Sequence, residues 1–291
     1  MIDRFVLGLL HNHRSQALLA TAGMLLLATS SQVRADYDPQ IGQIGSLGIA
    51  RASSQFQGWG SSVLSFQRGP QDITNPSGPL ANVGVASNAL GAGGGLVSLG
   101  DGGSITLGFD RPISNGEGSD FAVFENGFVS GAGGLAFLEL AFVDVSSDGS
   151  HFFRFPSVSL TQTVTQVGSF GLLDARNLNN LAGKYVSGYG TGFNLDDLAG
   201  VSPLLDIRQI TSIRITDVVG SIDPQIGTRD SLGNLVNDPF KTPFGSGGFD
   251  LTGIGVIHFA AVPEPASWAI LVSGLMIVTT IMRKGRTNLT R

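Results

Sequence analysis

The chain has 291 residues, contains no cysteine and carries a formal net charge of −5 at pH 7. The lack of cysteine excludes disulfide-stabilised folds, thiol nucleophiles and cysteine-ligated metal centres. Charge is unevenly distributed, because residues 36–260 contain ten basic and twenty acidic residues and therefore carry −10. Such a surface repels nucleic acid and attracts cations, so we expect no nucleic-acid partner.

The first 35 residues follow the order of a secretory signal peptide. A weakly basic segment, residues 4–14, precedes a short apolar stretch, Ala17–Ala28, and small residues flank Arg34. This pattern predicts export by the general secretion machinery and cleavage by signal peptidase after Ala35. An uncleaved N-terminal anchor is the alternative, but the apolar stretch is too short to span a bilayer comfortably.

The remaining body predicts an all-β fold. Residues 36–98 form a glycine-rich lead-in with weak strand signals, where we expect edge strands, and residues 99–260 form the main β body. Apolar or alternating runs rich in β-branched and aromatic residues predict strands there. The runs are 104–109, 121–124, 137–145, 152–155, 157–160, 213–216 and 254–258. Seven short strands predict a two-sheet sandwich, jelly-roll-like with long loops.

Little helix is expected in this body. Asn194–Gly200 has a capping residue, an acidic first turn and a terminal glycine, and Asp174–Leu181 could hold another turn. We expect both to lie in one long insertion, Val167–Asp206. A second long loop, Val219–Gly248, is also expected, and long loops on a rigid scaffold are common recognition sites.

The last thirty residues combine a proline break, an apolar run and a basic end. The break comprises Val262, Pro263, Glu264 and Pro265. Proline cannot continue a sheet, so the chain is expected to be extended there. Ala266–Met282 would reach roughly 25 Å as a helix, near the lower limit for a transmembrane helix. Arg283, Lys284 and Arg286 would hold its end in the cytoplasm.

This order resembles the PEP-CTERM sorting signal, and the resemblance covers residues 262–286. It implies processing near Pro263, Glu264 and Pro265 by a membrane enzyme of the exosortase family, after transient anchoring in the inner membrane. It also implies delivery to the surface or extracellular matrix of a Gram-negative bacterium that makes exopolysaccharide. The alternative is an ordinary C-terminal membrane anchor with a proline-rich hinge.

Three motifs give the body a resemblance of its own: Gly116–Asn126, Val145–Gly149 and Gly247–Leu251. They are similar to segments of PEP-CTERM surface proteins over most of residues 99–258. The fold resembles galactose-binding-like and carbohydrate-binding sandwiches, in which a calcium ion often ties loops together. The resemblance implies a binding or structural role.

Scattered carboxylates are the candidate calcium ligands, because calcium takes six to eight oxygens. If residues 121–124 form a strand, Asp120 and Glu125 lie at its opposite ends and cannot share one ion. We therefore expect either a site that pairs Glu117 or Asp120 with Asp250, or a separate loop site within Asp223–Asp238. The alternative is that these are solvated turn carboxylates.

Aromatic residues in glycine-rich segments are candidates for sugar binding. Trp59 and Tyr189 are the expected ligand-binding rings, and Tyr185 and Phe193 lie in similar sequence. The alternative is that these rings cover an open sheet edge.

No catalytic residues are expected. The body has two histidines, His151 and His258, and both are expected in ordinary sheet or turn positions. We therefore expect a non-enzymatic exported protein of the cell surface or biofilm matrix, with calcium and exopolysaccharide as its candidate ligands. The alternative is a secreted polysaccharide-modifying enzyme that uses paired acids.

Overall fold

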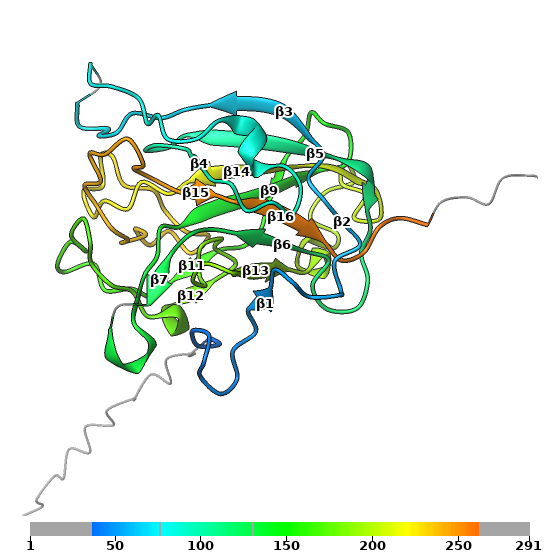
Figure 1. Cartoon of the computed structure of the whole chain (residues 1–291), viewed down its shortest axis with the longest axis horizontal. Coiled ribbons are helices and arrows are strands. Elements are labelled where there is room, and N and C mark those ends of the chain that lie inside the picture. The colour runs from blue at the N-terminus through cyan, green and yellow to red at the C-terminus, as the bar shows by residue number, and fades with distance from the viewer. Residues whose placement is uncertain (1–36, 76, 130, 262–291) are drawn as a thin grey trace, which may run out of the picture. The chain divides into compact units, whose positions relative to one another are not determined.

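The computed structural model describes residues 37–75, 77–129 and 131–261. These residues form an all-β protein, in which strands predominate and the helices are short 3-10 turns (Figure 1). No helix within those ranges has the length and apolar character that crossing a bilayer requires. The expected signal peptide with its cleavage site at Ala35, and the expected sorting signal at 262–286, lie outside the described residues.

The first sheet is antiparallel and has β6 at its centre. Its spatial order is β1 (Ile49–Ala50), β13 (Tyr189–Phe193), β6 (Phe121–Phe124), β16 (Gly253–Val256) and β2 (Gly58–Trp59). The central strand β6 is buried along its whole length, in agreement with its unbroken apolar sequence. The two outer strands come from the glycine-rich lead-in.

The second sheet is also antiparallel and contains the longest strands. Its spatial order is β10 (Phe153–Arg154), β9 (Ala141–Ser146), β14 (Ile210–Asp217), β5 (Ser104–Ile113) and β3 (Ser62–Gln67). Residues 147–152 join β9 to β10 as a hairpin. Strand β3, another part of the lead-in, is an outer strand.

Three small two-stranded sheets and four 3-10 helices complete the described fold. The small sheets are β11 (Val158–Ser159) with β12 (Leu178–Asn179), β4 (Val97–Ser98) with β15 (Asp250–Leu251), and β7 (Phe128–Val129) with β8 (Ala136–Phe137). The helices are η1 (Ala86–Ala89), η2 (Ala132–Gly134), η3 (Ala175–Asn177) and η4 (Leu195–Leu198).

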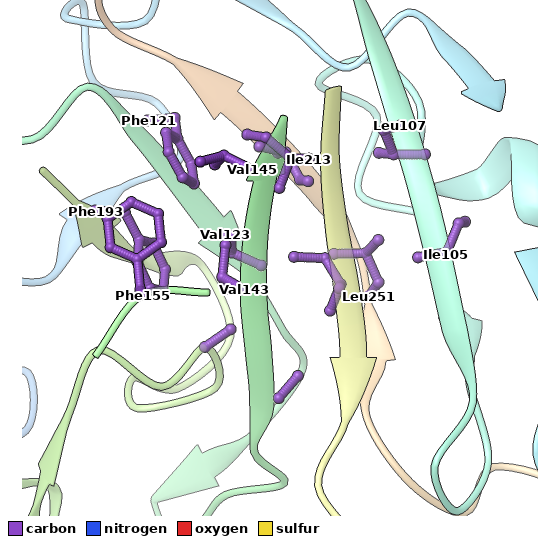
Figure 2. Close-up of a cluster of buried hydrophobic side chains, with 14 of the residues drawn as sticks. Ile105, Leu107, Phe121, Val123, Val143, Val145, Phe155, Phe193, Ile213 and Leu251 are labelled. Carbon is purple, nitrogen blue, oxygen red and sulfur yellow. The ribbon is translucent and has the colours of Figure 1, made fainter. Parts of the chain in front are cut away.

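Both large sheets contribute side chains to one hydrophobic core. The second sheet supplies aliphatic residues from β5, β9 and β14, and the first sheet supplies residues from β6, β13 and β16. Figure 2 shows Phe121 and Phe193 of the first sheet beside Phe155, which follows β10. The ring centroids of Phe121 and Phe193 are 5.4 Å apart, and Phe155 lies 5.0 Å from Phe193. These three aromatic rings therefore connect the two sheets.

Most predicted strands are confirmed, but the run 137–145 does not form one strand. β8 ends at Phe137, and β9 begins at Ala141. Between them, the amide of Leu140 donates to a carboxylate oxygen of Asp238 at 3.0 Å, so it cannot donate to a neighbouring strand. An apolar run with strand propensity is thus divided by a side chain that lies far away in the sequence.

The expectation that Val167–Asp206 is an insertion between strands is wrong. This segment contains β13, which pairs with β6 in the first sheet. Its glycines hide the strand signal, but Gly190 approaches the ring of Phe124 so closely that a Cβ atom would lie 2.9 Å from it. The two expected helical segments are each one 3-10 turn, η3 and η4, and Asp174 and Asn194 cap them.

An ion-pair network on β9, β10 and β14 should stabilise the second sheet. The buried carboxylate of Asp144 accepts from Nε of Arg154 at 2.8 Å and from Nε of Arg214 at 3.1 Å. We expect Asp144→Ala to lower the free energy of unfolding by about 2 kcal/mol, because it leaves two cations without their acceptor. Urea denaturation measures this loss. Asp110→Ala, an exposed carboxylate on β5, is the control and should change stability by less than about 0.5 kcal/mol. Equal losses would contradict the assigned role of the network.

Candidate functional site

A pocket of about 210 Å³ lies where β7, β8 and β15 approach the loop 240–248. In Figure 1 the labels of β7 and β15 are on the left. The described residues that line this pocket are Asn126, Phe128, Phe137, Glu139, Ser169, Phe170, Thr242, Phe244, Ser246 and Asp250. They combine aromatic rings, carboxyl groups, hydroxyl groups and one amide. We call this cavity the Phe-lined acidic pocket.

Four phenylalanines form a chain of ring contacts along the pocket wall. Phe128 stacks on Phe137 with centroids 5.1 Å apart, Phe137 lies 6.2 Å from Phe170, and Phe170 lies 5.6 Å from Phe244. Phe137 is buried, whereas Phe128, Phe170 and Phe244 are 52%, 70% and 42% exposed. Exposed aromatic rings that gather around a cavity are typical of a binding site.

Two carboxyl groups, Glu139 and Asp250, face the same pocket. Asp250 accepts from the hydroxyl of Ser98 and, at 2.9 Å, from the amide nitrogen of Asn126. Glu139 is only 6% exposed, and no hydrogen bond or ion pair joins its carboxyl group to another residue that the structure describes. The side chain of Glu125 interacts electrostatically with both, and its Oε1 atom is buried without a partner among the described residues.

Burial makes these carboxyl groups hard to ionise. Desolvation, reinforced by the neighbouring acids Glu125 and Asp250, raises the pKa of Glu139 well above its ordinary value. Desolvation raises the pKa of Asp250 to about 6, although hydrogen bonds from Ser98 and Asn126 act in the opposite direction. The pKa of Glu125 is also raised well above its ordinary value, chiefly by desolvation. The pocket is therefore a place where carboxyl groups hold protons at mildly acidic pH.

The local sequence explains how the wall is built. β6 ends at Phe124, and Glu125 then turns back so that its Oε2 accepts from the amide of Gly127. A Cβ atom on residue 127 would lie 2.6 Å from the carbonyl oxygen of Phe137, so only glycine lets the two segments approach. The motif ending in Glu125 and Asn126 also meets the motif that contains Asp250, because the side-chain amide of Asn126 donates to the carboxylate of Asp250.

The structure does not bring Asp120 and Asp250 together. β16 runs antiparallel to β6, with Gly253 opposite Phe124, so Asp250 lies near the far end of β6 from Asp120. The carboxylate of Asp120 accepts from the amides of Gly116 and Leu195 and contacts Nδ1 of His258 at 2.8 Å. Asp120 therefore ties loops together through hydrogen bonds.

Two of the other expected metal ligands, Glu117 and Asp223, are exposed, and the rest accept hydrogen bonds from the backbone. Glu117 lies in the loop before β6, and Asp223 accepts from the amide of Gln225 at 2.9 Å within a turn. The expected loop site at Asp223–Asp238 contains two further carboxylates. Asp230 accepts hydrogen bonds from the backbone amides of Leu232 and Asn234. Asp238 accepts one from the backbone amide of Leu140. These carboxylates thus hold backbone segments in place.

The described carboxylates do not gather into one group that could hold a calcium ion. Calcium takes six to eight oxygen ligands, yet residues 37–75, 77–129 and 131–261 contain no group of three or more acidic or histidine side chains that could hold a metal. We expect a chelator such as EDTA to leave the thermal melting temperature unchanged within about 1 °C, because the described residues gather no such group of acidic side chains. Differential scanning calorimetry with and without chelator measures this. A drop of several degrees, restored by added calcium, would contradict it.

The expected sugar-binding rings have structural contacts. Trp59 packs 5.4 Å from Phe124, with the guanidinium of Arg51 5.0 Å from its ring. Tyr189 begins β13 and is half-buried. The related rings of Tyr185 and Phe193 are buried. None of these four is among the residues that line the Phe-lined acidic pocket.

A second cavity, of about 180 Å³, is less suited to binding a ligand, because its charged side chains already have partners within the protein. Nζ of Lys184 lies 2.5 Å from a carboxylate oxygen of Asp38. The amide nitrogen of Asn180 donates to a carboxylate oxygen of Asp197 at 2.9 Å.

Glu139 is not among the site residues expected from the sequence, although the sequence contains a signal for it. It is the single charged residue in an apolar run from Ala136 to Val143, and a charge in such a run is unusual unless it has a partner or a function. The exposed rings of Phe170 and Phe244 had no comparable signal, because they lie in long loops whose path only the folded chain defines.

No protein-family model matches this chain, and no curated protein matches it either.

Proposed function

We propose that this chain is an exported, non-enzymatic binding protein of the cell surface or extracellular matrix, and that it binds a glycan in the Phe-lined acidic pocket. The observation that carries the proposal is the row of partly exposed phenylalanines beside Glu139 and Asp250. Flat aromatic rings pack against the C–H faces of sugars. Carboxyl, hydroxyl and amide groups nearby can then hydrogen-bond to sugar hydroxyls.

The finer architecture in this proposal is a jelly-roll-like sandwich of the two five-stranded sheets. Their shared core and their antiparallel strands support it. The pocket is formed by short strands and loops, which is a common place for recognition on a rigid sandwich.

Export and sorting form the second part of the proposal, and they rest on the sequence of the two ends. Signal peptidase would cleave after Ala35, and an exosortase would process the chain near Pro263, Glu264 and Pro265 after transient anchoring in the inner membrane. Intact-mass measurement of the protein from its native host tests both cleavages. A full-length chain recovered from the cytosol would refute this part.

Glycan binding is tested with the full chain on an array of oligosaccharides, followed by calorimetry on any ligand found. We expect Phe170→Ala and Phe244→Ala each to weaken binding about tenfold or more, because each removes an exposed stacking surface. Leu64→Ala, which removes a similarly exposed apolar side chain from β3, is the control and should bind normally. Failure to bind any carbohydrate would refute the proposal.

A polysaccharide-modifying enzyme is the second candidate, and one observation favours it. Glu139 and Asp250 face one pocket and both have raised pKa values, as a general acid requires. Turnover of a bound polysaccharide, lost in Glu139→Gln and in Asp250→Asn, would establish the enzyme. Binding without turnover would favour the non-enzymatic function.

A further inference from the structure

We propose that the ligand of the Phe-lined acidic pocket carries an ammonium group, and that it is an amino sugar with a free amine. This inference rests on the proposed function and deepens it, because it names the class of glycan. It is carried by the charges that line the pocket, by a buried carboxyl group without a partner, and by the aromatic wall.

The charge of the pocket is one-sided. Glu139 and Asp250 line it, Glu125 lies close enough to interact with both, and no lysine, arginine or histidine is among the described lining residues. At neutral pH Asp250 is ionised, because its pKa of about 6 lies below 7, and an environment of this kind attracts a cation and repels an anion. The negative charge of the whole body acts in the same direction.

Glu139 lacks the partner that a buried carboxyl group normally has. It is nearly inaccessible to solvent and lines the cavity, and within the described ranges its carboxyl group makes no hydrogen bond and no ion pair. Burying a carboxyl group without a protein partner costs free energy, whereas a ligand ammonium group can both pair with it and donate hydrogen bonds to it. A neutral sugar hydroxyl would supply the hydrogen bond without the charge.

The same chain shows elsewhere how such a carboxylate is satisfied. Asp144 is buried, and the guanidinium group of Arg154 pairs with it while lying 4.3 Å from the ring of Phe142. The Phe-lined acidic pocket has the carboxyl groups and the phenylalanine rings of this arrangement, but its described lining lacks the cation. Aromatic faces beside carboxyl groups favour an organic cation, because they add cation–π attraction.

Size and donor geometry favour an organic cation over a metal ion. The cavity of about 210 Å³ is far larger than a bare ion needs. The described part of the chain gathers no set of three acidic or histidine side chains for a metal. A sugar ring that carries an amine fills the space between the phenylalanines and places its charge near Glu139.

Binding of matched oligosaccharides to the full chain tests the inference. The probes are a β-1,4-linked glucosamine tetramer, its N-acetylated counterpart and a glucose tetramer of the same linkage, measured by calorimetry at neutral pH. We expect the glucosamine tetramer to bind at least tenfold more tightly than the other two, and the difference to shrink at high salt. Only the amine distinguishes this probe from the glucose tetramer.

Two isosteric variants identify the residues responsible. We expect Glu139→Gln to weaken glucosamine binding about tenfold or more while barely affecting neutral sugars, and Leu64→Ala to bind as the parent chain does. Thermal melting checks that each variant is folded, and Asp250→Asn replaces Glu139→Gln if the latter is not. Equal binding of all three tetramers would overturn the inference but leave glycan binding intact. Binding of none would overturn both proposals.

Discussion

Phe155→Ala is expected to lower the free energy of unfolding by about 3–5 kcal/mol, the loss typical of a large core aromatic. The ring is fully buried, and it lies 5.8 Å from Phe121 and 5.0 Å from Phe193. Its amide donates to the carbonyl of Val143 in β9, so its backbone belongs to the second sheet while its ring packs on the first. Alanine would leave a cavity between the two sheets and remove both aromatic contacts.

Urea denaturation of the two proteins measures this loss. Phe170→Ala is the matched control, because it deletes the same atoms from a ring that is 70% exposed. We expect the control to change the free energy of unfolding by less than about 0.5 kcal/mol. Similar losses in the two variants would show that the three-ring cluster does not hold the sheets together.

Stability is expected to fall as the pH rises from about 4 to about 6. Desolvation raises the pKa of Asp101 and of Asp250 to about 6 in the folded protein, against 3.8 for the ordinary residue. The folded state therefore binds protons more tightly than the unfolded state, so its stabilisation is complete below pH 3.8 and is lost as the pH passes 6. Each residue contributes about 3 kcal/mol over this window.

Other buried acids extend the loss of stability to higher pH. Desolvation also raises the pKa of Glu139, Asp217 and Asp238 well above the ordinary values. Two other carboxylates act in the opposite direction. Hydrogen bonds, chiefly with His151, lower the pKa of the exposed Asp148. At the half-buried Asp72, hydrogen bonds with Thr74 and the nearby Lys241 outweigh desolvation and lower its pKa. Their contribution is lost only below about pH 4, so we expect the most stable state in mildly acidic solution.

The double variant Asp101→Asn with Asp250→Asn tests the origin of the pH dependence. Asparagine can keep the hydrogen bond from the amide of Ile73 to residue 101, and those of residue 250 with Ser98 and Asn126. Urea midpoints measured from pH 4.5 to 7.5 should therefore fall less steeply in this variant. Asp110→Asn is the exposed control and should keep the parent slope. A parent protein that becomes more stable as the pH rises would contradict the prediction.

The strands were the most predictable part of the fold. The runs at 104–109, 121–124 and 213–216 are strands because their side chains alternate or are wholly apolar, and this pattern is local to each segment. The capping residue Asn194 likewise marked one of the 3-10 turns, because a cap acts on an amide two residues away.

Strand β13 and the break before β9 were not predictable from local pattern. β13 consists of Tyr-Gly-Thr-Gly-Phe, which has weak strand propensity and becomes a strand because its glycines fit against β6. The break before β9 depends on Asp238, whose carboxylate takes the amide of Leu140. Both outcomes are decided by partners that are distant in the sequence.

The candidate site shows which conclusions followed from composition and local pattern and which required the folded chain. Sequence alone established a cysteine-free, strongly acidic, all-β body and pointed to its carboxylates, since composition and strand period do not depend on the fold. Only the folded chain decided that Glu139 and Asp250 share a pocket with Phe170 and Phe244, and that Asp120 lies elsewhere. The physical reason is that a pocket is made by segments far apart in the sequence, whose approach depends on sheet register and loop paths.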